Sequence, residues 1–220
     1  MSRVRFHISV SLDGFVAGQH QSAEHPLGVG GMQLHEWLFA LAAWRASHGM
    51  DGGETNASSR VVEEGLAGVG ATIMGRRMFG GGEGPWAEEP WRGWWGDNPP
   101  FHMPVFVLTH HARSPLELDG GTTFTFVTEG IGAALEQARL AAGGEDVTVA
   151  GGAQVARQYL AAGLVDDMEL HLVPCLLGGG SRLFEDLGDS APRFEQVRVV
   201  EGPGVTHLGY RALRTTRPPG

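Results

Sequence analysis

The sequence contains a single cysteine, Cys175, among its 220 residues. One cysteine cannot form a disulfide within the chain, so a fold stapled by internal disulfides is excluded. Cys175 follows Pro174 in an apolar run that reads as a strand. At such a position we expect a buried structural thiol and not a nucleophile.

Basic residues are scarce relative to acidic ones. The chain has 16 Lys and Arg against 25 Asp and Glu, which gives a formal net charge of -9. A charge of this sign argues against a general surface for nucleic acid or for anionic membranes. We therefore expect no nucleic-acid partner, although a local basic spot for one phosphorylated ligand is compatible with this balance.

Long apolar runs are also missing. No stretch approaches the roughly 20 residues that a membrane-spanning helix needs. Charged and polar residues interrupt the first 15 residues, which therefore lack the apolar core of a signal peptide. We expect a soluble, cytoplasmic protein without a membrane partner.

The remaining composition is that of a globular protein, with 42% hydrophobic and 19% charged residues. The 35 glycines indicate many turns, loops and close backbone approaches. The chain is long enough for one large domain or two small ones, but it shows neither an internal repeat nor a free linker. We therefore expect residues 1–220 to form a single domain.

Apolar periodicity predicts an alternation of strands and helices. Residues 3–12 alternate with the period of a strand, and a hairpin is expected to turn at residues 202–204. Between them we predict helices over 34–44, 57–70 and 131–144, and strands within 71–75, 103–113, 122–130 and 166–177. This order favours an α/β layer with a mainly parallel sheet and an antiparallel edge.

The segment "GGGEGPWAEEPWRGWWGDNPP", residues 80–100, contains four tryptophans and many residues that break regular structure. Four indoles are costly to leave in water, so we expect an ordered loop. The tryptophans from Trp86 to Trp95 have two interpretations: they stack on a flat heterocycle, or they pack at a dimer interface.

Three predicted strands end in groups that suit anions. Gly151 and Gly152 separate a strand from a helix, and glycines there let a phosphate approach the free backbone N–H groups. The pattern is not GxGxxG, so a standard Rossmann site is not indicated. Taken alone, this glycine pair favours tight packing over phosphate binding.

The other two strand ends carry basic side chains. "IMGRRMF" places Gly75, Arg76 and Arg77 after a strand, and guanidinium groups match phosphate oxygens, although surface arginines are the alternative. "VFVLTHHAR" delivers a hydroxyl, two imidazoles and a guanidinium into one turn. Adjacent histidines point apart on a strand and no carboxylates accompany them, so we expect no metal site. Because ligands bind beyond the carboxyl ends of parallel strands, the three ends together suggest a dinucleotide crevice.

The segments "SLDGFVAG", "IMGRRMF", "VFVLTHHAR" and "VAGGAQVARQYLAAGLVDDMELHLVPCLLGGGSRLF", in this order, resemble the dihydrofolate-reductase-like superfamily. The chain is most similar to stand-alone relatives of the C-terminal reductase domain of the bifunctional riboflavin-biosynthesis deaminase-reductase. The resemblance covers almost the whole chain, without the deaminase zinc motif. It implies a three-layer fold in which flanking helices cover a twisted, mostly parallel sheet with an antiparallel C-terminal hairpin at its edge.

The resemblance also implies NADPH as cofactor. The stretch like "MGRRM" would approach the adenosine phosphates, "LTHHAR" the 2′-phosphate, "AGGAQV" the pyrophosphate and "DGFVAG" the nicotinamide. The residues implied for cofactor binding are Val16, Ala17, Gly75, Arg76, Arg77, Thr109, His110, His111, Arg113, Gly151, Gly152, Ala153, Gln154 and Val155.

Two carboxylates are candidates for catalysis. Asp13 reads either as a residue that fixes its turn or as a proton donor. Glu36 lies on the predicted helix where dihydrofolate reductases carry the carboxylate that grips the pterin, but it also fits a solvent-facing position. The expected activity is hydride transfer from NADPH to a flat nitrogen heterocycle of the pterin or pyrimidine class, by a homodimer. A nucleotide- or flavin-binding protein without strong catalysis is the alternative.

Overall fold

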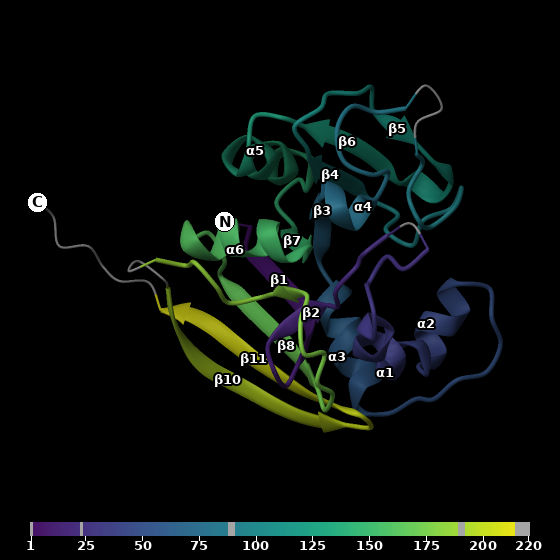
Figure 1. The fold of residues 1–220 in the computed structure, drawn as a ribbon, viewed down its shortest axis with the longest axis vertical. Coiled ribbons are helices and arrows are strands. Elements are labelled where there is room, and N and C mark those ends of the chain that lie inside the picture. The colour runs from purple at the N-terminus through teal and green to yellow at the C-terminus, as the bar shows by residue number, and fades with distance from the viewer. Residues whose placement is uncertain (1, 23, 88–90, 189–191, 214–220) are drawn as a thin grey trace, which may run out of the picture.

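A nine-stranded sheet forms the centre of the computed structural model, which describes residues 2–22, 24–87, 91–188 and 192–213 (Figure 1). The order of its strands is β10-β11-β8-β1-β7-β3-β4-β6-β5. Their bounds are β1 Val4–Ser11, β3 Val69–Gly75, β4 Pro104–Leu108, β5 Leu116–Glu117, β6 Thr123–Val127, β7 Asp146–Gly151, β8 Asp167–Val173, β10 Arg193–Gly202 and β11 Val205–Leu213.

The six central strands, from β8 to β6, run parallel to one another. The antiparallel strands lie at the edges: β11 and β10 beyond β8, and β5 beyond β6. In the β10–β11 hairpin, Gly202 pairs with Val205, as the glycines at its turn indicated. The predicted fold class, a mostly parallel sheet with an antiparallel C-terminal hairpin edge, is confirmed.

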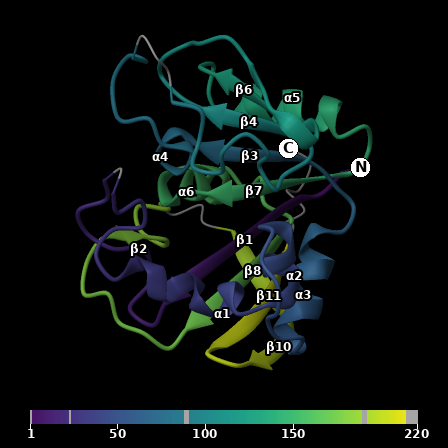
Figure 2. The ribbon, with the colours of Figure 1, turned by 90° about the vertical axis from the view of Figure 1, so that its right-hand side faces the viewer.

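Helices cover both faces of the sheet. Val4, Phe6 and Val10 of β1 pack in the same core as α5 (Ile131–Ala141) and α6 (Ala153–Ala161). The intervening Ser9 accepts a hydrogen bond from Trp37 of α1 (Glu36–Phe39), with Nε1 and Oγ 3.3 Å apart. Because successive residues of a strand point to opposite faces, α1 and α6 lie on opposite sides of β1. Figure 2 shows α1, α2 (Ala42–Ser47) and α3 (Ala57–Leu66) grouped together near β8 and β11.

The helix predicted over residues 34–44 is broken, and this prediction was wrong. The chain forms a 3-10 turn at Gly31–His35, then α1, and then α2. Leu41, between the two α-helices, is extended and bridges to Glu54. The backbone of Glu54 bonds on both sides of it, to Ala40 and Ala42 at 2.8 Å each, and so takes over hydrogen bonds that a continuous helix would make.

The capping residues of α3 were easier to read. Asn56 accepts a hydrogen bond from the backbone N–H of Ser58, and Ser59 accepts one from the backbone N–H of Asn56. This reciprocal cap starts the helix where the sequence indicated. The longest helix in the described part of the chain, α5, has 11 residues, so none there is long and apolar enough to cross a membrane.

A small second sheet, which the sequence analysis does not predict, lies beside the carboxyl end of β1. β2 (Phe15–Ala17) pairs antiparallel with β9 (Ser181–Arg182). Away from this sheet, the one-turn helix α4 (Arg76–Phe79) directly follows β3. The pairing joins the "DGFVAG" segment to the chain that follows Gly178–Gly180. Both segments are thereby fixed at the end of β1.

Candidate functional site

The three glycine- or basic-rich strand ends belong to neighbouring strands. β3 lies between β7 and β4 and is parallel to both. Their carboxyl ends therefore meet at one edge, where Gly75 ends β3, Leu108 ends β4 and Gly151 ends β7. The residues that follow, including Arg76, Thr109 and Gly152, are gathered there.

The glycines at this edge differ in what surrounds them. A Cβ atom on Gly75 would lie 2.8 Å from Cγ2 of Val155, so Gly75 allows β3 and α6 to pack closely. A Cβ atom on Gly152 would meet nothing within 4 Å. Gly151 has a φ of 128°, and the peptide bond between Gly151 and Gly152 is cis. Gly75 thus has a packing role, whereas the space in front of Gly152 is open.

Gly152 is also the N-cap of α6, and it makes no side-chain cap hydrogen bond. The first N–H groups of a helix lack intrahelical partners and carry the positive end of its dipole. Ala153 and Val155 are buried, so a ligand here meets their backbone, while the Gln154 side chain is exposed. The start of α6 therefore offers backbone donors to an anion.

Arg76 and Arg113, which we call the arginine pair, both lie over the Trp86 ring. The guanidinium carbons are 3.2 and 4.7 Å from its centroid. Arg76 also donates hydrogen bonds to Thr109 Oγ1 at 3.4 Å and to the Gly81 carbonyl at 3.1 Å. Arg113 donates to the Trp91 carbonyl at 2.6 Å. The Trp86 indole thus brings two positively charged guanidinium groups close together.

Neither member of the pair makes a salt bridge with a carboxylate among the described residues. Burial, and then the neighbouring Arg113, lower the pKa of Arg76; burial, and then Arg92, lower the pKa of Arg113. Guanidinium groups nevertheless stay charged in proteins. The Nε atom of Arg76 is buried without a hydrogen-bond partner in the described part of the chain. This is an incompletely satisfied positive site.

A cavity of about 660 Å³ opens beside the arginine pair. Its lining comprises Pro85, Trp86, Ala87, His110, His111, Ala112, Arg113, Ser114 and Pro115. The Thr109 hydroxyl is already engaged within the turn, where it accepts from the backbone N–H of His111 at 3.2 Å. His110 is exposed and His111 half-buried.

Arg77 is not brought into this group. Its side chain is 68% exposed and pairs with Glu83, with Nη2 and Oε1 3.3 Å apart. Of the two consecutive arginines, only Arg76 joins Arg113 on the Trp86 ring.

The tryptophan-rich loop packs on its own chain. Trp86, Trp91 and Trp94 donate their indole N–H groups to the carbonyls of His111, Phe79 and Met78 at 2.8 to 3.0 Å. Trp95 stacks on Phe124 of β6, with ring centroids 6.1 Å apart. The four indoles are half-buried, and the face of Trp86 next to Arg76 is occupied by that side chain.

Asp13 lies at the other end of the site, after β1. It accepts hydrogen bonds from the Ser11 hydroxyl at 2.6 Å and from the backbone N–H groups of Gly178 at 2.7 Å and Leu177 at 3.2 Å. These bonds, led by that of Ser11, lower the pKa of Asp13 to about 2. A carboxylate of this kind holds no proton near neutral pH and ties two loops together.

Glu36 begins α1 and is exposed. Burial first, and then the charges of Asp13 and Glu36, raise the pKa of the Cys175 thiol. Both carboxylates therefore lie near Cys175, which is half-buried and remains a thiol at neutral pH. Val16 and Ala17 in β2 are 7% and 5% exposed, so they present little side chain to a ligand.

Two residues of this site escaped the sequence reading. The two interpretations of Trp86, a platform for a heterocycle or a part of a dimer interface, do not include its contact with Arg76. Ser11, which fixes Asp13, was one of several polar residues in an alternating strand. For Ser11, the spacing Ser-x-Asp at the end of a strand is a usable signal in the sequence. For Trp86, the contact with Arg76 spans a loop and leaves no such signal.

Comparisons with known proteins agree with this architecture. Residues 2–208 match the family described as the RibD C-terminal domain. No curated protein matches the chain. A putative riboflavin biosynthesis protein from Shewanella sp. PV-4 has a similar structure, with a TM-score of 0.59 and 20% identity over 97% of this chain and 100% of that one.

Two further structures extend the comparison. RibD from Acinetobacter baumannii has a TM-score of 0.58 and 19% identity, and the alignment covers 97% of this chain but 59% of that one. Dihydrofolate reductase from Enterococcus faecalis, complexed with NADP(H), has a TM-score of 0.51 and 12% identity over 96% of each chain. The chain belongs to the RibD C-terminal domain family and has the dihydrofolate-reductase-like fold.

Proposed function

We propose that the protein is an NADPH-dependent reductase that transfers a hydride to a small, flat nitrogen heterocycle. The observation that carries this proposal is the arginine pair on Trp86, which lacks a carboxylate partner among the described residues. It lies at the same sheet edge as the uncapped start of α6. Two anionic groups of one ligand, a pyrophosphate and a 2′-phosphate, suit these two places.

The residues fit that cofactor on two counts. The buried Nε of Arg76 needs an acceptor, and the space in front of Gly152 would be filled by a side chain. Gly151, Gly152 and the backbone of Ala153 would hold the pyrophosphate. Arg76 and Arg113, with His110 and His111 in the cavity wall, would hold the 2′-phosphate.

The reduced nicotinamide supplies the hydride, and the protein's task is to place it against the acceptor. β2 runs beside the expected nicotinamide position, and Asp13 fixes the loops on which β2 and β9 depend. Glu36, exposed at the start of α1, has a carboxylate available to bind a ring N–H of the substrate. We assign it that role and assign Asp13 the role of an anchor.

The pterin or pyrimidine class of substrate is supported by the family. The A. baumannii relative is named RibD, and a Thermotoga maritima structure with 14% identity and a TM-score of 0.55 is named as a deaminase and 5-amino-6-(5-phosphoribosylamino)uracil reductase. The ionised state of Asp13 favours one rival, a nucleotide- or flavin-binding protein without strong catalysis, because it leaves the site without a ready proton donor.

Stopped-flow measurement of NADPH oxidation over pteridines, pyrimidines and flavins separates the two. The reductase predicts loss of nicotinamide absorbance with at least one pterin or pyrimidine. Tight NADPH binding with no turnover of any acceptor would establish the rival.

We also propose that the chain is one cytoplasmic domain and forms a homodimer. β1, near the N-terminus, lies between β7 and β8, so the sheet draws on both halves of the sequence. β10 is a ten-residue edge strand on which Val197 and Val199 are 48% and 57% exposed. The unpaired backbone groups of such an edge are a template for pairing with another chain. Light scattering at micromolar concentration tests the dimer; a monomer mass would refute it.

A further inference from the structure

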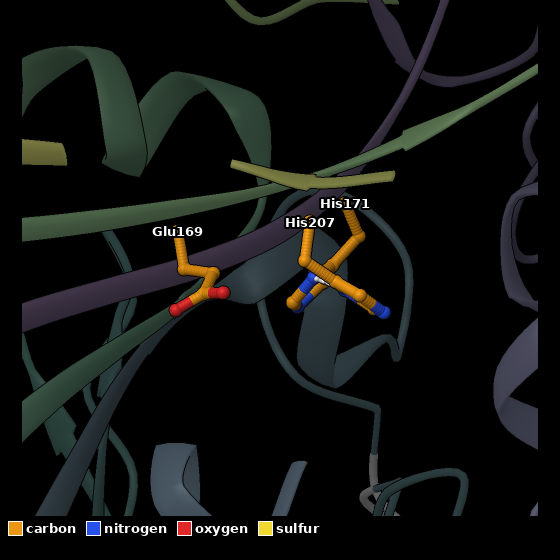
Figure 3. A group of neighbouring side chains, drawn as sticks. All are labelled: Glu169, His171 and His207. Carbon is orange, nitrogen blue, oxygen red and sulfur yellow. Dashed lines mark hydrogen bonds between the residues drawn. The ribbon is translucent and has the colours of Figure 1, made fainter. Parts of the chain in front are cut away.

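Three ionisable side chains meet on the face of the sheet opposite α6. Glu169 and His171 are two residues apart in β8 and so point to the same side. His207 of β11 is the direct cross-strand partner of His171. Figure 3 shows the three side chains projecting on the same side of these strands, with the two imidazoles in contact.

The three groups are close together and shielded from solvent. One donor atom of each lies within 4.8 Å of the donor atoms of the other two. Glu169 and His171 are each 8% exposed, and His207 is fully buried. Trp37 covers the imidazoles, its ring centroid 4.9 Å from that of His171 and 5.0 Å from that of His207.

Neighbouring side chains also orient each of these three groups through hydrogen bonds. His207 Nε2 is 2.9 Å from Ser58 Oγ in α3, and its Nδ1 is 2.8 Å from Nδ1 of His171. Both oxygens of Glu169 accept from Nη2 of Arg198, at 2.9 and 2.7 Å. Outer partners of this kind fix the ring orientation and tautomer of metal-binding histidines.

We propose that Glu169, His171 and His207 bind a divalent transition-metal ion of the Zn²⁺ class. Two imidazoles and one carboxylate are an established zinc ligand set, which leaves one tetrahedral position for solvent. Imidazole donors exclude Mg²⁺ and Ca²⁺, which prefer oxygen ligands. The ion would tie β8 to β11 beneath α1 and α3.

The protonation states suit this role. The Nδ1–Nδ1 contact of 2.8 Å requires that one of these nitrogens accepts a hydrogen bond, so at least one of the two imidazoles is neutral and keeps a lone pair there. In the Nδ1–Nδ1 contact one ring donates the shared proton. When the metal binds, that proton moves to Nε2 of the same ring, so no proton is lost. At His207, the Ser58 hydroxyl accommodates either protonation state of Nε2, because a hydroxyl donates and accepts.

The two nitrogens need to separate only slightly, and each ring must also turn so that its Nδ1 points at the ion and not at the other ring. Two nitrogens bound to Zn²⁺ at 2.0–2.1 Å in a tetrahedron lie about 3.3 Å apart. The imidazole nitrogens, now 2.8 Å apart, would separate by about half an ångström. The Glu169 carboxylate would move toward them while Arg198 follows on its flexible stem.

Calorimetric titration of chelator-treated protein with ZnCl₂ at pH 7.5 tests the proposal. We expect one equivalent per chain, an affinity weakened about 10- to 100-fold by Ser58→Ala, and a greater loss in Glu169→Gln and His207→Gln. His25→Ala, which removes an exposed imidazole, is the matched control and should bind as the native protein does. Co²⁺ in place of Zn²⁺ should give visible absorption bands typical of four-coordinate cobalt.

Circular dichroism without metal establishes which variants fold. If a ligand variant does not fold, Ser58→Ala and the cobalt spectrum decide. The proposal is overturned if the native protein shows no saturable Zn²⁺ binding, or if one-equivalent binding is unchanged in the folded variants. Equal losses in His25→Ala and His207→Gln would also overturn it, because they would indicate non-specific binding.

Discussion

The arginine pair and the buried histidines are two gatherings of basic side chains that differ in burial and in charge. Arg113 lines a cavity and Arg76 lies beside it on the Trp86 ring; both keep their charge, because a guanidinium does not give up its proton. His171 and His207 lie inside the protein, and the half-buried His7 lies beside His171. Burial is the largest cause of the lowered pKa of each of these three residues, which we call the histidine cluster.

The comparison shows that basic side chains serve two purposes, as charged groups that bind anions and as neutral groups that form hydrogen bonds or bind metals. A charge at a cavity wall without a carboxylate beside it recruits an anion. An imidazole removed from water becomes neutral and serves as a hydrogen-bond partner or ligand. The predictions below challenge this contrast, starting with the largest expected change in free energy.

Acidification should destabilise the protein through the histidine cluster. The folded-state pKa of His7 and of His207 is lowered to about 4, below the usual 6.5, so the unfolded chain binds these protons more readily. The contribution of these neutral histidines to the free energy of unfolding is therefore fully present above pH 6.5. It falls as the pH drops toward 4, by at most about 2 kcal/mol per histidine between pH 6.5 and 5. Urea unfolding at pH 7 and pH 5 measures this; equal free energies would contradict it.

Replacement of Arg76 should weaken NADPH more than any other single change at the cavity. Arg76→Ala removes a partly buried partner of the 2′-phosphate, which costs about 2 kcal/mol or more, or roughly 30-fold in Kd. NADH, which lacks that phosphate, should lose much less. Fluorescence titration with both nucleotides provides the values.

Arg77→Ala is the matched control, because Arg77 adjoins Arg76 in sequence but pairs with Glu83 in solvent. We expect a change of no more than about fivefold from an exposed pair of this kind. Similar losses in the two variants would show that net charge and not the cavity decides affinity.

The two glycines of neighbouring strand ends should separate packing from binding. Gly152→Leu places a side chain in open space and should weaken NADPH at least about tenfold with little change in thermal midpoint. Gly75→Leu meets Val155 and should lower stability by about 1–3 kcal/mol or prevent folding. Differential scanning fluorimetry with nucleotide titration distinguishes them, and a Gly152 variant that binds normally would remove α6 from the site.

The smallest effect is expected at Glu36. Glu36→Gln should raise the KM for the heterocycle by a few fold, about 1 kcal/mol, and leave NADPH affinity unchanged. Asp13→Asn should alter stability but remove no limb of the pH–rate profile above pH 4, because Asp13 is already ionised throughout that range. Steady-state kinetics from pH 5 to 9 tests both; a lost basic limb in Asp13→Asn would make Asp13 the proton donor.

Much of the fold, and the gathering of residues at the carboxyl edge of β7, β3 and β4, was accessible from sequence because each part is local. The alternation of strands and helices, the hairpin glycines and the cap at Asn56 all act within a few residues. The groups at the three strand ends are contiguous in sequence, and a parallel sheet brings such ends to one edge. The residues at that edge follow directly from strand prediction.

The rest depended on contacts between distant segments. The break at Leu41 arises from a bridge to Glu54, and the position of Arg76 from a loop tryptophan. The meeting of His171 and His207 requires the register of β8 against β11. Periodicity shows that Glu169 and His171 share a face, but it does not show which residue of a later strand lies opposite.

The central claim is that the edge formed by β7, β3 and β4 binds the phosphates of NADPH. Its most direct test is a pair of Kd values, for NADPH and for NADH, on the native protein at one ionic strength. The account predicts that NADPH binds at least about tenfold more tightly, because the arginine pair pairs with the 2′-phosphate. Equal Kd values would contradict it.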